Sequence, residues 1–111
     1  MTIRDMVQAI QIEVRDTDIL PQRAAELLMK ATALVGNVNT EIREADAAFN
    51  QVLLTCLDGD EAANRARSRA DVRPEEARRR EARDTLTLLV EVIRSLKVFI
   101  KAQQEEMRLA R

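Results

Sequence analysis

The sequence predicts an all-α protein: a long antiparallel two-helix coiled-coil hairpin with a short N-terminal helix, completed by oligomerisation. Alanine, leucine, arginine and glutamate dominate the 111 residues, and these residue types are strong helix formers. Only two glycines and two prolines are present, so the chain has few turns and few elements. Two long segments also carry apolar residues at alternating steps of four and three, which is the heptad pattern of packed helices.

The first helix is predicted over residues 2–15. Thr2 followed by Asp5 resembles a capping box, in which each side chain bonds the other's backbone N–H. Apolar residues then share one face at helical spacing: Ile3, Met6, Val7, Ile10 and Val14. The turn-like residues 16–18 follow, and Pro21 is well suited to begin the next helix.

The second helix is predicted over residues 22–57, because a heptad seam runs through it without a polar interruption. The seam consists of Ala24, Leu28, Ala31, Val35, Val38, Ile42, Ala45, Phe49, Val52 and Cys56. Gly36 and residues 37–40 are poor helix formers, but the seam keeps its phase through them, which favours one helix of roughly 54 Å. Asp58 and Gly59 are typical of its end.

The third helix is predicted over residues 75–110, after Pro74 and with acids in its first turn. Its seam is Ala82, Leu86, Leu89, Ile93, Leu96, Ile100, Gln103, Met107 and Ala110. A second apolar stripe lies beside it: Leu88, Val92, Phe99 and Ala102. The apolar arc is wider than one seam needs, so the first helix or a second copy must cover it. Leu88, Val92 and Phe99 are the candidate oligomer face.

The chain is predicted to be one helical domain, 1–111, with residues 59–73 as a polar tip that can include a short helix. If Cys56 faces Ala82, the two seams align in antiparallel register and Phe49 faces Leu89. In that register residues 59–79 project from the end of the hairpin.

The predicted tip is rich in arginine. Six arginines make up the candidate binding tip: Arg65, Arg67, Arg69, Arg73, Arg78 and Arg79. The guanidinium fork suits phosphates and carboxylates, so one interpretation is a contact to nucleic acid or a phosphorylated ligand. The other is a solvated, salt-bridged surface, which the interspersed acids favour. Residues 1–60 carry net −5 and residues 61–111 net +4, which favours pairing between the two halves of the chain.

The composition argues against catalysis. Histidine is absent, which excludes histidine acid–base chemistry and most zinc sites. Cys56 reads as a small buried hydrophobe. The pairs Glu41 with Glu44 and Asp58 with Asp60 are weak metal candidates, since di-iron bundles require Glu-x-x-His pairs. No catalytic, cofactor-binding or metal-binding residue is therefore predicted.

Four short motifs lie between residues 58 and 96: Asp58-Gly59-Asp60, Asn64-Arg65-Ala66, Pro74-Glu75 and Ile93-Arg94-Ser95-Leu96. With them the chain resembles small helical-hairpin proteins of tailed phages and prophages. This resemblance covers about half the chain and implies a phage-encoded accessory protein that acts by binding.

The expected function is a non-enzymatic helical protein-interaction module: an adaptor, inhibitor or assembly subunit. It is expected to be a homo-oligomer with a protein partner, and to need no cofactor. The alternative is a small helical subunit that binds nucleic acid or a phosphorylated ligand through the tip. The chain has no signal-peptide pattern and no apolar run of the roughly 20 residues that span a bilayer, so a cytoplasmic setting is expected.

Overall fold

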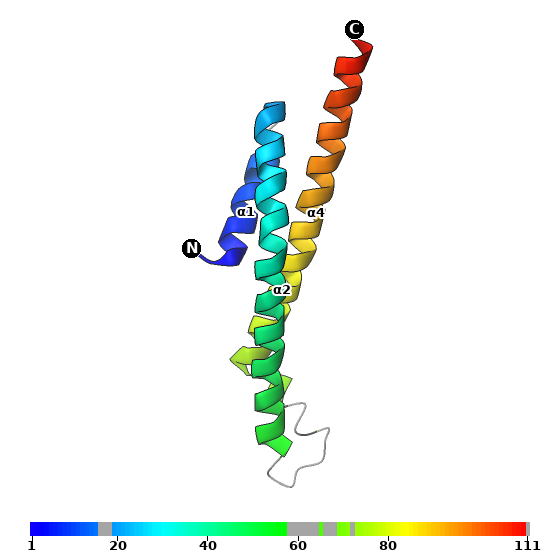
Figure 1. Cartoon of the computed structure of the whole chain (residues 1–111). Helices are drawn as coiled ribbons and strands as arrows, with labels where there is room; N and C mark the ends of the chain where they lie inside the picture. Colours follow the sequence, from blue (N-terminus) through cyan, green and yellow to red (C-terminus); the bar gives the residue numbers. More distant parts are fainter. Residues whose placement is uncertain (16–18, 58–64, 66–68, 72, 111) are drawn as a thin grey trace.

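A computed structural model describes residues 1–15, 19–57, 65, 69–71 and 73–110. It confirms the all-α fold: α1 spans Ile3–Val14, α2 spans Pro21–Leu57 and α4 spans Pro74–Leu109. The two long helices run antiparallel and pack on each other, while α1 packs against both (Figure 1). The molecule is a rod of 73 × 24 × 19 Å.

Helix α1 begins with the predicted capping box. The backbone N–H of Asp5 donates to the Thr2 hydroxyl, and the backbone N–H of Thr2 donates to the Asp5 carboxylate, both at 3.1 Å. These bonds satisfy N–H groups that the first turn leaves without a helical partner, and they lower the pKa of Asp5. Val7 and Ile10 are the residues that α1 buries.

Helix α2 is continuous through Gly36, as the unbroken seam predicts. Its buried residues are Ala24, Leu27, Ala31, Val38, Ala45, Phe49 and Cys56. The remaining seam positions, Leu28, Val35, Ile42 and Val52, are only half-buried. One edge of the seam is therefore covered more completely than the other.

Helix α4 starts at Pro74, with Arg73 as its N-cap residue. Its buried residues are Glu76, Ala82, Thr85, Leu89, Val92 and Leu96. The centre of the buried face thus lies between the two predicted stripes, because Thr85 and Val92 are more buried than Leu86 and Ile93. Two neighbours, α1 and α2, share the wide apolar arc, so the face that points between them is the most buried.

The predicted register of the hairpin is wrong. Phe49 lies against Arg79, with the guanidinium carbon 4.5 Å from the ring centroid, and not opposite Leu89. Cys56 lies in a shallow pocket with Arg73, and not opposite Ala82. Sliding one heptad seam along another by whole heptads leaves the apolar match intact, so the apolar pattern could not choose between these registers.

The closed end of the hairpin is shorter than the register predicted. Residues 74–79 do not project, since α4 already lies alongside α2 there. Arg65 and residues 69–71 have helical backbone and Ala70 is fully buried. The short helix expected near residues 60–67 falls mostly outside the described residues.

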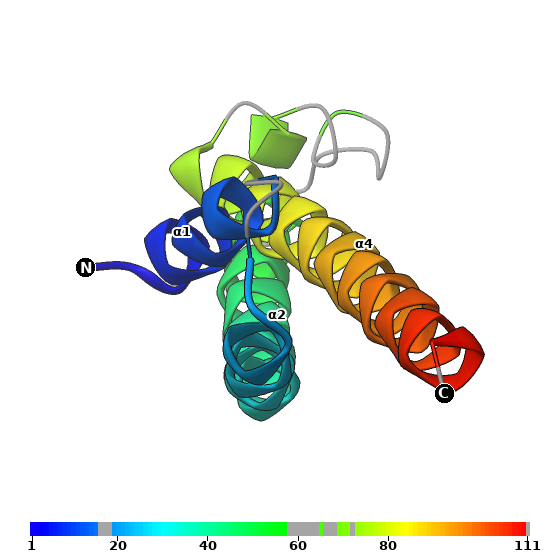
Figure 2. The same cartoon turned by 90° about the horizontal axis from the view of Figure 1, so that it is seen from above.

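The two long helices diverge toward the opposite, open end. Both views show α4 leaning away from α2 on its way to the C-terminus, which lies beyond the first turn of α2 (Figures 1 and 2). On α4 no described residue after Leu96 is buried, whereas Ala24, Leu27 and Ala31 of α2 stay buried in this half.

Candidate functional site

The arginines at the start of α4 are engaged in ion pairs with α2. Arg78 donates to both carboxylate oxygens of Glu41, at 2.8 and 3.1 Å, and lies 3.6 Å from Glu44. This bidentate contact lowers the pKa of Glu41 and raises that of Arg78. Arg78 was expected on a binding tip, but the structure places it across the helix interface.

Asp46 of α2 receives two further arginines from α4. Arg83 donates to both of its oxygens, at 3.0 and 3.1 Å, and Arg79 lies 3.3 Å away. Arg79 also sits over the ring of Phe49 and pairs with Glu76 at 3.4 Å. The expected pairing of acidic and basic halves is realised here, so the salt-bridged interpretation holds for Arg78 and Arg79.

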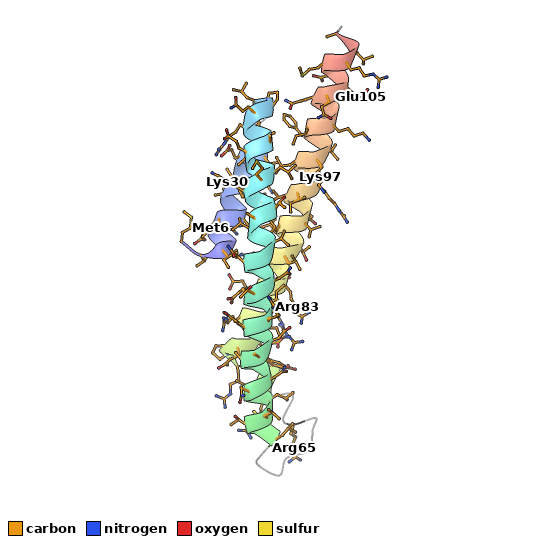
Figure 3. All side chains as sticks on the ribbon, in the orientation of Figure 1. Met6, Lys30, Arg65, Arg83, Lys97 and Glu105 are labelled. Atoms are coloured by element: carbon orange, nitrogen blue, oxygen red, sulfur yellow. The ribbon has the colours of Figure 1, made fainter. Side chains whose placement is uncertain are left out.

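The other candidate tip residues lie at the closed end. Arg65, Arg69 and Arg73 are exposed, and Figure 3 shows Arg65 near the end of α2. Arg67 lies outside the described residues. Whether these arginines contact a phosphorylated ligand stays a prediction.

The expected oligomer face is not a free surface. Val92 is only 3% exposed and belongs to the chain's own core. Leu88 and Phe99 are half-buried and pack against the same core. The sequence predicts that either the first helix or a second copy covers the broad apolar arc of α4. In the structure, α1 covers the side of α4 that carries Val92.

Two ion pairs border α1 on the side that it covers. The guanidinium of Arg23 in α2 donates to the Glu13 carboxylate, with one bond of 2.9 Å, and this lowers the pKa of Glu13. Arg4 lies 3.9 Å from Glu81 and 3.5 Å from the Thr85 hydroxyl of α4. A pocket of about 180 Å³ lies there, and its charged side chains pair with one another or with Arg78.

The opposite side of the α2–α4 pair has no described element over it. Successive residues of a helix turn by about 100°, so Leu28, Val35 and Ile42 lie on the edge of α2 away from Arg23, Leu27 and Lys30. Arg23, Leu27 and Lys30 line a pocket against α1. Figure 2 shows α1 on one side of the long pair.

The same division holds on α4, where Glu81 and Thr85 meet α1 and a second row lies on the far edge. Together the two edges form the open stripe, defined as Leu28, Val35, Ile42, Leu86, Ile93 and Ile100. All six are partly buried and pack against the core. The apolar core therefore reaches the surface along this line.

The open stripe has two unlike borders. On α2 the border is small and neutral, with Ala25, Thr32, Gly36 and Asn39 exposed. On α4 the border begins with Val90 and is otherwise basic, with Arg94, Lys97 and Lys101; all four residues are exposed. Figure 3 places Lys97 level with Lys30 of α2, in the diverging half of the pair. This basic row was not predicted, although Arg94, Lys97 and Lys101 recur in the sequence at steps of three and four.

Nothing in the described ranges forms a cluster of candidate metal ligands. No three Asp, Glu, Cys or His side chains there come together as metal ligands. Glu41 and Glu44, considered as a metal pair, instead face Arg78. Cys56 is buried, as expected. None of the described helices is both long and apolar enough to cross a membrane.

The fold and surface define a class only: an all-α helical hairpin with a third helix on one side and an apolar line on the other. No protein-family model, curated protein or solved structure matches the chain.

Proposed function

We propose that the protein is a non-enzymatic interaction module that binds another protein along the open stripe. The observation that carries this proposal is the stripe itself: six aliphatic side chains in line, packed against the core on one side and half-exposed on the other. Apolar surface in a continuous line is typical of a surface that another protein covers.

The ion pairs elsewhere support the same proposal. Arg78, Arg79 and Arg83 are held by acids of α2, so much of the arginine-rich region is charge-compensated within the chain. A phosphate-binding surface would need those guanidinium groups available. The alternative function, binding of nucleic acid or a phosphorylated ligand, rests on Arg65, Arg69 and Arg73.

The predicted homo-oligomer and the resemblance to phage proteins stay predictions. A second copy could not use the expected face as a whole, since Val92 is buried. A protein other than a second copy is the partner we favour, because a second copy would carry the same cations, Arg94, Lys97 and Lys101, along its own stripe.

The proposal is tested by blocking the stripe at its exposed borders. Thr32→Arg with Val90→Arg adds bulk on both sides of it, while Ala47→Arg with Val98→Arg adds the same groups elsewhere on α2 and α4. Tagged protein is used to purify partners from the native host, identified by mass spectrometry. We expect one partner to be retained by the wild type and the control pair and lost with the stripe pair. Retention by all three proteins would show that binding lies elsewhere.

A further inference from the structure

The basic border of the open stripe is uncompensated within the described part of the chain. Arg94, Lys97 and Lys101 follow one another at steps of three and four, so they lie along one flank of α4. No ion pair or hydrogen bond to a described residue is formed by any of them. By contrast, the four arginines nearer the start of α4, Arg78, Arg79, Arg80 and Arg83, all pair with carboxylates.

The difference lies in what α2 offers opposite. Next to Arg78 and Arg83, α2 supplies Glu41 and Asp46. Next to the later cations, the α2 border is neutral, with Ala25, Thr32 and Asn39 in the places where acids would be needed. The positive row therefore faces an apolar stripe with no acid on its far side.

We infer that the open stripe binds an amphipathic helix of another protein whose flank over α4 is acidic. This inference rests on the proposed function and names the chemistry of the partner. Aliphatic positions of the partner helix would cover Leu28, Val35, Ile93 and their neighbours, while its carboxylates would meet Arg94, Lys97 and Lys101. Complementary charge of this kind fixes orientation and speeds association.

A helix fits the stripe because the stripe repeats once per heptad on each long helix. Residues seven apart in a helix are about 10.5 Å apart along its axis, which matches apolar positions at i, i+3 and i+7 of a third helix. The molecule already contains this arrangement on its other side. There α1 buries Val7 and Ile10 and places Glu13 on Arg23 of α2.

The neutral border of α2 also permits close approach. A Cβ added at Gly36 would meet no atom within 4 Å, and Thr32 and Asn39 are short. A second copy of the chain is a poorer occupant, since its own stripe carries the same three cations. Like charges facing each other oppose association.

The test uses two synthetic peptides of about 18 residues, roughly 27 Å as helices. Both carry leucines at i, i+3 and i+7, and one flank is glutamate in the first peptide and lysine in the second. We expect the wild-type protein to bind the glutamate peptide about tenfold more tightly at low salt, and expect this preference to shrink at roughly 150 mM salt as exposed charges are screened. Fluorescence anisotropy of labelled peptides measures both affinities.

Matched variants locate the effect. Arg94→Glu, Lys97→Glu and Lys101→Glu together should reverse the peptide preference. Arg15→Glu, Lys30→Glu and Arg65→Glu change the net charge equally but lie away from the stripe, so the preference should persist. Circular dichroism confirms that both variants keep their helix content, and the exposed positions make this the expected result.

The inference and the proposed function fail differently. Equal affinity for both peptides, abolished by Thr32→Arg with Val90→Arg, would overturn the acidic partner and leave binding at the stripe standing. Absence of binding by either peptide would also overturn the inference, and the host purification would then decide the proposed function separately. A dimer in light scattering that Thr32→Arg with Val90→Arg disperses would show that a second copy covers the stripe. Tighter binding to phosphatidylglycerol vesicles than to the glutamate peptide would overturn the inference of an acidic partner helix in favour of a membrane surface.

Discussion

Gly36 is the residue at which the helix and the intrinsic preference of the sequence conflict most. Glycine costs about 1 kcal/mol relative to alanine inside a helix, yet α2 continues through it. Packing of the flanking seam residues, including Val35 and Val38, outweighs that cost. The heptad phase was the signal that made this predictable, because a loop would have no reason to preserve it.

Gly36→Ala should therefore stabilise the protein by about 0.5–1 kcal/mol. The new methyl group meets no neighbour, so only the backbone preference changes. Urea unfolding followed by circular dichroism measures the difference. Unchanged or lower stability would mean that α2 is interrupted near this residue.

Residues of the buried core and of the open stripe should respond differently to truncation. Leu89 is fully buried and Phe49 only 6% exposed, so Leu89→Ala or Phe49→Ala should cost roughly 2–5 kcal/mol by leaving a cavity. Ile93 is half-buried, and Ile93→Ala should cost distinctly less because solvent already reaches it. Equal losses at Leu89 and Ile93 would show that the stripe is covered in the free protein.

Single elements were largely predictable, whereas their alignment was not. The starts of α1, α2 and α4 follow from local signals: the Thr2 capping box, Pro21 and Pro74. The register depends on long-range charge pairs such as Arg78 with Glu41, and these cannot be chosen from heptads that match equally well at several offsets. The exposure of the open stripe could not be predicted for a related reason. An apolar heptad position has the same sequence pattern whether one or two neighbouring helices cover it.

The register can be tested directly with cysteine pairs. In a Cys56→Ala background, Glu41→Cys with Arg78→Cys should be joined efficiently by a short bis-maleimide. Ala45→Cys with Ile93→Cys, a pair from the heptad alignment that the structure contradicts, should not. Mass spectrometry reads the cross-link, and the opposite pattern would restore that alignment.

Acid should loosen the contacts between helices. The pKa values of Glu41 and Glu13 lie below the ordinary value of 4.5 because Arg78 and Arg23 bind their carboxylates. A carboxyl whose pKa is lower in the folded state contributes its full stabilisation above the unfolded pKa, and loses it as the pH falls through the folded pKa. Stability should therefore fall on acidification below about pH 4.5.

The double variant Glu41→Gln with Glu13→Gln removes both titrations. It should be less stable than the wild type at pH 7 and should lose less stability between pH 5 and pH 3, compared by urea midpoints. A wild-type slope retained in the variant would assign the acid sensitivity to other carboxyls, such as Asp5, whose pKa is lowered by its contacts with Thr2.

At the scale of the whole molecule, the rod offers two places where a ligand could bind: the open stripe along its length and the arginines at its closed end. They are chemically distinct, because the stripe is apolar with cations on one border, while the closed end presents the exposed arginines Arg65, Arg69 and Arg73. The salt dependence of binding therefore distinguishes the open stripe from the closed end. Binding that is driven by phosphate contacts weakens steeply as salt rises, whereas at the stripe the contribution of aliphatic burial changes little and only the preference for an acidic partner shrinks.

Replacing Arg65, Arg69 and Arg73 together with alanine puts the closed end to the test. Thermal stability should hardly change, because exposed charged pairs contribute only about 0–1 kcal/mol each and alanine favours helix. If the end binds phosphate, the wild type should be retained on heparin at low salt and released by about 200 mM, and the triple variant should not be retained. The charge-matched variant Arg94→Ala, Lys97→Ala and Lys101→Ala is the control. Loss of retention in that variant, with the closed end intact, would place the anion-binding surface on α4, and a large drop in the melting temperature of the first variant would make its arginines structural.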